Sequence, residues 1–580
     1  MAGADLALLP DGQALSPVAF PTCLPVQLGP CAAWLHPAQG PVKRACGVVL
    51  CPPFGYEALG TRRGWRMLAD TLSHAGLHTL RFDHTGTGDS PGEEAPGLLA
   101  EWLEDIARAI AWMRARADVS QVALCGLRLG GLLAASVAAS LARDRVAALA
   151  LLAPVWSGAA HARELRLMSR TQADEAAEAE WLNIAGFRLH RGDLPALSAL
   201  ELGPALSGCS ARTLILGQRP GRALPLGPHV EWRQFPEAAD FLRDAHLSMP
   251  PVAAFREIAS WLASGSPEAD PSAVAVPQAS TRLAMDGVVE QAIAFGDSHP
   301  LYGVYCTPAG ALSSGAPAAL LLNTGANHWT GNGRFAVHLA RRLARQGVAS
   351  LRFDAAGIGD SPARPDRPET ATVPEVYCEE PLADIRTALD WLHQRGHAGI
   401  RAFGLCAGAH FAWQAALRDE RLTGLVLVNL PAFDRSAGGA PALDGGPPPG
   451  EIPWLRRPRM LVRRLRAEAD TALAQRFGIE ADLDPACGAM RRLMARGVRL
   501  LLAYSDGDRG LRELRAHFGR QGRRLSRWPG ITRVTIPDAD HAFSRPGAME
   551  VLLALVERHL LMPAPDRTDT HSNRMQPPCP

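Results

Sequence analysis

The chain has 580 residues, 47% of them hydrophobic and 20% charged, and a formal net charge of only +2 at pH 7. This length exceeds what one hydrophobic core usually holds, and the near-neutral charge gives no signal for nucleic acid. No apolar run approaches the roughly 18 residues of a membrane span. The start of the chain lacks the pattern of a secretory signal, and the eleven cysteines show no CxxC spacing. We therefore expect a reduced, cytoplasmic protein of several domains, without a metal or a cofactor.

The first half reads as strands that alternate with helices and end in short glycine-rich turns. Apolar strands are predicted at 26–35 (a short pair), 46–51, 77–83 and 121–124, and amphipathic helices at 64–75 and 99–116. Two turns recur later in the chain: Gly86-Thr87-Gly88-Asp89-Ser90 and Gly126-Leu127-Arg128-Leu129-Gly130. This alternation predicts an α/β fold with a mostly parallel, doubly wound sheet.

The second half repeats the order of the first. The Arg-Phe-Asp…Gly-x-Gly-Asp-Ser-Pro segment at 81–91 returns at 352–362 almost residue for residue, and the turn at 126–130 returns at 404–408 as Gly-Leu-Cys-Ala-Gly. A strand at 318–325 and helices at 335–346 and 382–395 occupy the corresponding places. We interpret this as duplication of a whole domain, giving two tandem α/β domains.

Composition predicts the domain boundaries. A Ser-, Pro- and Ala-rich stretch at 264–280 is typical of a linker. The polar, Pro-rich end at 563–580 predicts a disordered tail. The expected domains are therefore 1–263 and 281–562.

Each half also carries an insertion after its glycine-rich elbow turn, at about 156–206 and 433–495, and we expect both insertions to form helical caps. The second contains a cluster of arginines: Arg456, Arg457, Arg459, Arg463, Arg464 and Arg466. A solvated helix face is the simpler interpretation of this cluster. The alternative is a basic patch for an anionic acyl carrier or the phosphates of CoA.

The second half supplies the residues of a nucleophilic site. Cys406 stands at the centre of the Gly-x-Cys-x-Gly turn, which is the Gly-x-Ser-x-Gly nucleophile elbow with sulfur in place of oxygen. A helix N-terminus at this position favours the thiolate. Asp508 follows one later strand, with Asp506 as the second choice, and His541 follows the next. We predict Cys406 as nucleophile, His541 as base and Asp508 as orienting acid, at the carboxyl edge of one sheet.

An acyl-transfer site also needs donors for an oxyanion. We expect them to be the backbone N–H of Ala407 and a second one from the turn after the first strand, either Ala326 or Asn327. His328 and His410 are other candidates for the site, and for both a pocket-lining or surface role is the simpler interpretation.

The first half lacks this chemistry. Arg128 stands where the nucleophile belongs, and a guanidinium cannot attack a carbonyl. The loop at 218–222 has no acid, and His246 is left as the former base. We interpret this half as a pseudo-hydrolase in which Arg128 either holds a carboxylate or phosphate or forms a salt bridge inside a dead site.

Both halves resemble α/β-hydrolase domains of the bacterial serine aminopeptidase and lipase type, over nearly all of the ordered chain. Pro52-Pro53-Phe54, Glu57 and Arg62-Arg63, with the two glycine-rich turns of the first half, are similar to the exosortase-A-associated hydrolases. The resemblance implies esterase, thioesterase or acyltransferase chemistry. The chain departs from it by cysteine in place of serine, a choice also seen in dienelactone hydrolases and in some thioesterase domains.

The expected function is hydrolysis of a small-molecule acyl ester or thioester through an acyl group bound to Cys406. The acyl group could be linked to a carrier or to CoA, and the oligomeric state is not predicted. One alternative is an acyltransferase that uses the same thioester intermediate. The other is a non-catalytic scaffold or binding protein of a biosynthetic assembly.

Overall fold

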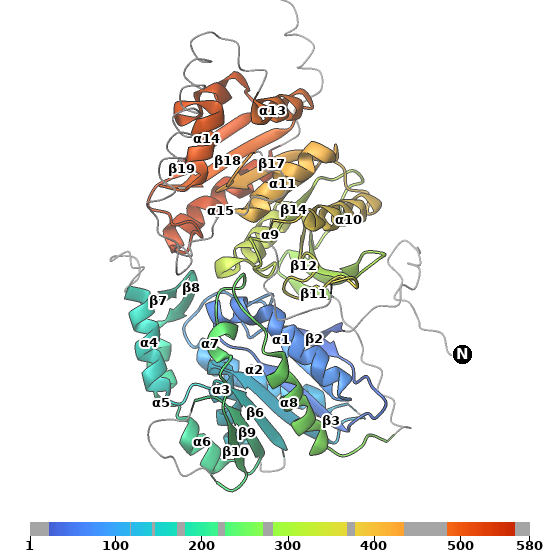
Figure 1. The fold of residues 1–580 in the computed structure, drawn as a ribbon, viewed down its shortest axis with the longest axis vertical. Helices are drawn as coiled ribbons and strands as arrows, with labels where there is room; N and C mark the ends of the chain where they lie inside the picture. The colour runs from blue at the N-terminus through green and yellow to red at the C-terminus, as the bar shows by residue number, and fades with distance from the viewer. Residues whose placement is uncertain are drawn as a thin grey trace, which may run out of the picture. The chain divides into compact units, whose positions relative to one another are not determined.

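The computed structural model describes residues 23–116, 118–141, 145–170, 180–218, 227–270, 282–367, 377–433 and 484–562. The chain divides into two compact units (Figure 1). The first unit comprises Met1–Ala309, Ala326–Arg341 and Arg352–Pro374, and the second comprises Gly310–Gly325, Arg342–Leu351 and Glu375–Pro580. This division assigns parts of the second repeat to the first unit, and the predicted boundaries 1–263 and 281–562 stay a prediction.

The start of the predicted linker is ordered, since backbone hydrogen bonds join 267–269 to 43–45. The rest of the linker, from residue 271, and the tail at 563–580 lie outside the described residues.

The first sheet has eight strands in the order β1-β2-β4-β3-β5-β6-β9-β10. The strands are β1 (Leu24–Leu28), β2 (Cys31–His36), β3 (Cys46–Cys51), β4 (His78–Phe82), β5 (Gln121–Leu127), β6 (Ala148–Leu152), β9 (Arg212–Leu216) and β10 (Val230–Arg233). The pairs β1–β2 and β2–β4 are antiparallel, and all later pairs are parallel. The principal helices of this sheet are α1 (Tyr56–His74), α2 (Leu98–Arg114), α3 (Leu129–Ser140) and α8 (Val252–Ser264), with a short α7 (Ala238–Phe241).

Alternation along the buried strands explains why helices cover both faces. In β3, Val49 and Cys51 pack in one hydrophobic cluster with residues of α2 and α3. Val48 and Leu50 point the other way, into a second cluster with residues of α1 and α8. Successive side chains of a strand face opposite sides, and a parallel sheet with both faces buried is the doubly wound arrangement. The predicted fold class is confirmed.

The second sheet has nine strands in the order β11-β12-β13-β15-β14-β16-β17-β18-β19. Its strands are β11 (Arg282–Met285), β12 (Val288–Phe295), β13 (Leu301–Pro308), β14 (Ala318–Leu321), β15 (Ala349–Phe353), β16 (Ile400–Leu405), β17 (Leu422–Val428), β18 (Arg499–Ser505) and β19 (Ile531–Ile536). Apart from the extra edge strand β11, this is the strand order of the first sheet, so the repeat seen in the sequence is also a repeat of topology. The helices of this repeat are α9 (Phe335–Arg345), α10 (Glu380–Gln394), α11 (Ala407–Arg418), α13 (Pro485–Ala495), α14 (Gly510–Phe518) and α15 (Pro546–Leu561), with 3-10 helices η2 (Asn332–Arg334) and η4 (Arg520–Arg527).

The first insertion is less helical than predicted. Between β6 and β9 it forms α4 (Gly158–Arg170), the hairpin of β7 (Trp181–Ile184) and β8 (Phe187–His190), η1 (Arg191–Asp193), α5 (Leu194–Ala199) and α6 (Leu202–Gly208). Of the second insertion the structure describes only α13 and the residues next to it, and the arginine cluster 456–466 lies outside the described residues.

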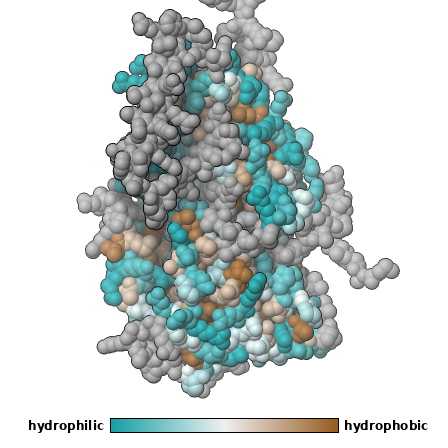
Figure 2. Space-filling model, in the orientation of Figure 1, coloured by the Kyte–Doolittle hydropathy of each residue, from teal (hydrophilic) through white to brown (hydrophobic). Residues whose placement is uncertain are grey.

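Among the described helices, none combines the length and the hydropathy that crossing a bilayer requires. On the face drawn in Figure 2, hydrophobic residues occur as separate spots among hydrophilic ones. Scattered exposed apolar residues of this kind are normal in folded proteins.

The repeated Arg-Phe-Asp…Gly-Asp-Ser segments meet inside the first unit through a reciprocal pair of ion pairs, which we call the Arg–Asp exchange. Arg81 of the first segment donates from Nη1 to Oδ1 of Asp360 in the second, at 2.6 Å. Arg352 of the second segment donates from Nη2 to Oδ1 of Asp89 in the first, at 2.9 Å. All four side chains are buried. Each arginine therefore neutralises the loop aspartate of the other repeat.

Further donors complete the exchange. Arg62 donates from Nη2 to Asp360 at 2.8 Å, and the indole Nε1 of Trp329 donates to Asp89 at 2.8 Å. Burial alone would raise the pKa of Asp360, but the charges of Arg62 and Arg81 hold it well below its usual range. The carboxylate is therefore charged in the folded chain.

Replacing one member of the exchange should destabilise the protein strongly. Asp360→Asn leaves Arg62 and Arg81 buried without their counter-charge, a change that typically costs about 3–5 kcal/mol. We expect a clear fall in the midpoint of thermal unfolding, measured by circular dichroism. Asp366→Asn is the matched control, because Asp366 is an exposed aspartate six residues further on. Equal midpoints for the two variants would contradict a structural role for the exchange.

Candidate active site

Cys406 lies at the sharp turn between β16 and α11, with φ 54° and ψ −114°. A non-glycine residue in this region is strained, and the neighbouring glycines make the turn possible. A Cβ at Gly404 would collide with the backbone of Gly408, and a Cβ at Gly408 would lie 2.6 Å from the carbonyl oxygen of Asn323. The turn therefore has the backbone of a nucleophile elbow and presents Cys406 at the N-terminus of a helix.

The structure brings Asp508 and His541 together. Asp508 follows β18, His541 follows β19, and Oδ2 of Asp508 lies 2.7 Å from Nδ1 of His541. The other oxygen, Oδ1, accepts a hydrogen bond from the backbone N–H of Gly510 at 2.7 Å. The second choice, Asp506, is an exposed side chain of the same loop. The geometry thus favours Asp508 as the partner of the histidine.

His541 and Cys406 shift the pKa of one another. Burial alone would raise the pKa of the Cys406 thiol, but the nearby imidazole of His541 and its charge outweigh burial and lower it. The hydrogen bond to the Asp508 carboxylate, followed by the influence of Cys406, raises the pKa of His541 to about 10. Both shifts favour a thiolate beside an imidazolium.

Asn429 supports this arrangement and was not among the predicted residues. It is fully buried directly after β17, with φ 49°. Its Oδ1 accepts a hydrogen bond from the backbone N–H of Ser505 at 2.8 Å, and its Nδ2 donates to the carbonyl oxygen of His541 at 2.9 Å. Asn429 thus links the end of β18 to the loop that carries the histidine. A buried amide at the carboxyl edge of a sheet is the signal that could have identified it.

Tyr377 is a second residue that the sequence did not indicate. Its hydroxyl lies 3.9 Å from Sγ of Cys406, and this contact contributes to the lowered pKa of the thiol. The ring packs edge-on against His410, with centroids 5.8 Å apart. His410 is itself buried on α11, and its expected pocket-lining or surface role stays a prediction.

The two expected oxyanion donors differ in position. Ala407 is the first residue of α11, the place where an elbow supplies its donor, and its backbone N–H helps to lower the pKa of the Cys406 thiol. Ala326 belongs to the first unit, and its role stays a prediction. His328, also in the first unit, is buried beside Asp354 and Asp360, at 3.6 and 3.4 Å, so it belongs to the surroundings of the Arg–Asp exchange.

The elbow of the first repeat has the same backbone without the chemistry. Arg128 has φ 52° and ψ −119°, nearly the values of Cys406. Its guanidinium donates to Glu57 at 2.7 Å and to Glu164 at 3.4 Å. Two carboxylates already neutralise this side chain, which favours the salt-bridge interpretation over an anion site. Within the described residues, no hydrogen bond joins His246 to Arg128.

Comparison with known proteins gives a family match for part of the first repeat, which includes the elbow at Arg128. Residues 63–183 match the family model of the serine aminopeptidase, S33, and the comparison with curated proteins found no match.

Three solved structures illustrate what the chain resembles. An alpha-beta serine hydrolase homologue from Coxiella burnetii is 15% identical, with TM-score 0.29, over 46% of this chain and 96% of that one. Est1E from Butyrivibrio proteoclasticus is 17% identical, with TM-score 0.30, over 42% and 99%. An acetyl xylan esterase from Paenibacillus sp. R4 is 18% identical, with TM-score 0.28, over 47% and 85%. Similarity at this level identifies neither a substrate nor a reaction for this chain. The family match covers part of the first repeat, and both repeats have the mostly parallel, elbow-bearing sheet of the α/β-hydrolase fold.

Proposed function

We propose that the second repeat is an acyl hydrolase that cleaves a small-molecule carboxylic ester or thioester through an acyl group bound to Cys406. The observation that carries this proposal is the connected set of Cys406, His541 and Asp508, with a lowered pKa at the sulfur and a raised pKa at the imidazole. The family matched by part of the chain is a family of hydrolases, in line with this reaction class. A carrier- or CoA-linked acyl group stays a prediction of the sequence, because its arginine cluster is not among the described residues.

The first step forms the thioester. The thiolate of Cys406 attacks the carbonyl carbon, and a C–S bond forms while the carbonyl electrons move to oxygen. Collapse of this intermediate breaks the bond to the alkoxide or thiolate leaving group, which takes its proton from the imidazolium of His541. Asp508, hydrogen-bonded at Nδ1, keeps the ring oriented and stabilises its charge.

The second step regenerates the enzyme. Neutral His541 takes a proton from water, whose oxygen attacks the thioester carbonyl, and Cys406 leaves as a thiolate while the carboxylic acid departs. The N–H of Ala407 and the backbone of Ala326 are the proposed oxyanion donors. We assign the Tyr377 hydroxyl to stabilising the thiolate, because it lies 3.9 Å from Sγ.

Transfer of the acyl group to an amine or thiol is the second candidate, and the sulfur favours it because thioesters react readily with such acceptors. The exposure of the base favours hydrolysis, since 54% of the His541 side-chain surface is accessible to water. Water can therefore reach the group that activates it. We place hydrolysis ahead of transfer on this ground.

Removing the nucleophile should abolish acylation. We expect wild-type protein to gain the mass of one acyl group when mixed with aryl esters or acyl thioesters, measured by intact mass spectrometry, and Cys406→Ala to gain none. Cys378→Ala is the control, because Cys378 is another partly exposed cysteine of the same unit. If no ester or thioester acylates Cys406 in the folded wild type, a scaffold or binding role replaces the proposed hydrolase.

The pH dependence of alkylation tests the ion pair. Because the pKa of Cys406 is lowered, its reaction with iodoacetamide should already be fast at neutral pH and should fall only in acid, where the thiolate takes a proton. Burial raises the pKa of Cys378, so alkylation at that site should require alkaline solution. In His541→Ala the profile of Cys406 should move towards higher pH. Peptide mass spectrometry measures the alkylation of each cysteine. Identical pH profiles for the two cysteines would refute the thiolate assignment.

Product ratios separate hydrolysis from transfer. In Cys406→Ser, the acyl-enzyme is an oxygen ester, which discriminates less in favour of nitrogen and sulfur acceptors. We expect the ratio of transferred to hydrolysed product, at a fixed concentration of added amine or thiol, to be lower in this variant than in wild type. Free acid as the sole wild-type product with every acceptor would eliminate the transferase candidate and leave the hydrolase.

A further inference from the structure

Asn429 stands at a position that is polar in the second repeat and apolar in the first. It is the residue after β17, and its backbone N–H donates to the carbonyl oxygen of Ala503 at 2.8 Å. In the first repeat, Ala153 is the residue after β6, and its N–H donates to the carbonyl oxygen of Leu216 at 2.7 Å. Ala503 and Leu216 are the strand partners of the residues that precede Asn429 and Ala153. The two positions are therefore equivalent.

The backbone of this turn does not require an asparagine. It is left-handed in both repeats, with φ 49° at Asn429 and 39° at Ala153. Asparagine adopts this conformation more readily than most residues, but the first repeat forms the turn with alanine. The role of the amide therefore lies in its side-chain contacts.

These contacts fix the orientation of the amide. The backbone N–H of Ser505 can only donate, so Oδ1 of Asn429 faces it, at 2.8 Å. The carbonyl oxygen of His541 can only accept, so Nδ2 faces it, at 2.9 Å. The second hydrogen of Nδ2 points to the hydroxyl oxygen of Ser505, at 3.2 Å. The fully buried side chain thus has partners for both of its polar atoms and cannot turn over without losing them.

Through these bonds Asn429 holds both residues of the acid–base pair. Ser505 is the last residue of β18, and its carbonyl oxygen accepts the backbone N–H of Asp508 at 3.2 Å. His541 is held directly, through its own carbonyl oxygen. Oδ2 of Asp508 lies 2.7 Å from Nδ1 of His541. A single amide therefore connects the two loops that must meet for this contact.

Packing contributes little to the orientation of the His541 ring, because 54% of its side-chain surface is exposed. A ring in such surroundings is oriented mainly by its hydrogen bonds and by the position of its backbone. Asn429 holds that backbone and, through Ser505, the loop of Asp508. Loss of the amide would therefore affect the placement of the ring first.

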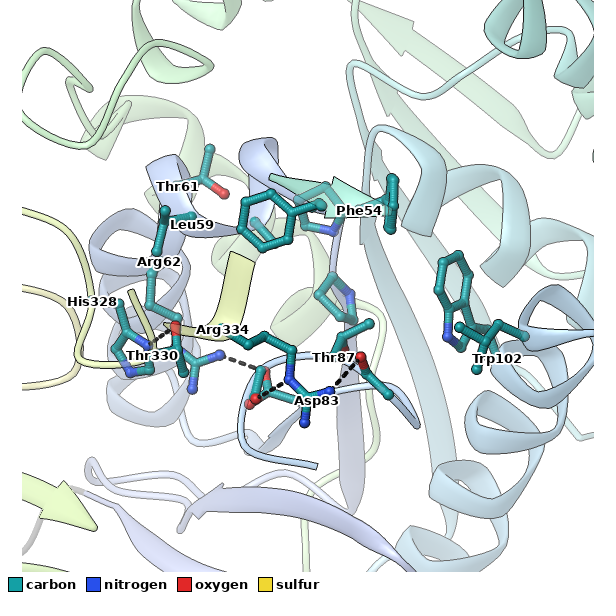
Figure 3. Close-up of a pocket in the computed structure, with 18 of the residues that line it drawn as sticks. Phe54, Leu59, Thr61, Arg62, Asp83, Thr87, Trp102, His328, Thr330 and Arg334 are labelled. Carbon is teal, nitrogen blue, oxygen red and sulfur yellow. Dashed lines mark hydrogen bonds and ion pairs between the residues drawn. The ribbon is translucent and has the colours of Figure 1, made fainter. Parts of the chain in front are cut away.

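The first repeat keeps the shape of such a site. Its elbow has nearly the φ and ψ of the second elbow. Its unit contains a cavity of about 60 Å³, walled in part by Phe54 and Trp102, with Arg62 paired to Asp83 at 2.5 Å (Figure 3). The fold of a repeat therefore forms without an amide after the strand that follows the elbow.

The first repeat lacks the residues that would make the bridge. Gln218, two residues after the end of β9, is the counterpart of Ser505 and is exposed. The methyl group of Ala153 can neither donate nor accept a hydrogen bond. Within the described part of the chain, the bridge thus occurs in the repeat with the cysteine elbow and not in the repeat with the arginine elbow.

We propose that Asn429 is a positioning residue, whose amide sets the place of the His541 imidazole against Asp508 for the reaction at Cys406. The placement of the ring rests on the geometry alone, and its catalytic consequence rests on the proposed function. Asn429 makes and breaks no bond in the reaction and acts through the histidine.

The placement is measured first, in full-length protein with Cys406→Ala in every sample, so that this part does not depend on turnover. The titration of His541 is followed by NMR of protein labelled at histidine Cε1, and His541→Gln identifies its signal. Asp508 raises the pKa of His541, and a ring that has moved away from Asp508 loses part of this rise. We expect Asn429→Ala to lower the pKa of His541 by about one pH unit, the effect of one weakened hydrogen bond to a charged group.

Leu392→Ala is the matched control, because it removes a buried side chain of α10 in the same unit. It should lower the midpoint of thermal unfolding, as core truncations do, and leave the titration of His541 like that of the parent. Asn429→Gly replaces Asn429→Ala if the latter does not fold, since glycine adopts a left-handed backbone without strain. The same fall in the pKa of His541 is expected.

A parent-like titration in a folded Asn429 variant would overturn the proposal, and so would an equal fall in Leu392→Ala. Loss of folding in both Asn429 variants would overturn it too, because the amide would then hold the fold rather than the imidazole.

The catalytic consequence is measured with Cys406 in place. We expect Asn429→Ala to lower kcat for an aryl ester by about ten- to hundredfold, as a misplaced catalytic group does, with little change in KM. An unchanged kcat beside a shifted titration would overturn the catalytic consequence. A parent without turnover, in which Asn429→Ala still shifts the titration, would refute the proposed hydrolase and support the placement of the ring by Asn429.

Discussion

The elbow turn is the constraint on which each repeat depends. Its central residue is held at φ 52–54° in both, and the glycines beside it touch the neighbouring backbone too closely for any side chain. The first repeat keeps this strained backbone although Arg128 cannot attack a carbonyl. Its conservation within the chain therefore reflects the packing of strand, turn and helix rather than catalysis. The proposed chemistry of the second repeat depends on the side chain placed on that turn, Cys406.

The Arg–Asp exchange explains the other repeated motif. In the sequence, Asp89 and Asp360 stand at equivalent places of the two repeated segments. In the structure each is buried against an arginine of the other repeat, Arg352 and Arg81 respectively. A buried ion pair contributes little compared with a well-packed apolar pair, but losing one partner is costly. Replacing either member of a pair alone would therefore destabilise the protein. This explains why the motif is also present in the repeat that has Arg128 in place of a nucleophile.

Local sequence patterns were enough to predict most of the fold and part of the candidate site. Apolar periodicity located the strands and helices, and the self-similarity of 81–91 and 352–362 indicated two sheets. The chain order predicted Asp508 and His541, which the structure brings together, and their role with Cys406 stays a prediction. Asn429 and Tyr377 were not predicted, because their contacts depend on the packing of the end of a strand and of the turn before a helix. The Arg–Asp exchange was not predicted either, because no local sequence pattern specifies which arginine lies beside which aspartate.

The two carboxylates that pair with Arg128 determine which side chain the elbow of the first repeat can hold. Glu57 comes from α1 and Glu164 from α4, so the guanidinium joins the core to the cap at the place where a substrate would meet a nucleophile. Restoring a cysteine there would leave two glutamates facing each other without their counter-charge and would raise, not lower, the pKa of the new thiol. The two glutamates around this elbow therefore suit an arginine at its centre and not a cysteine.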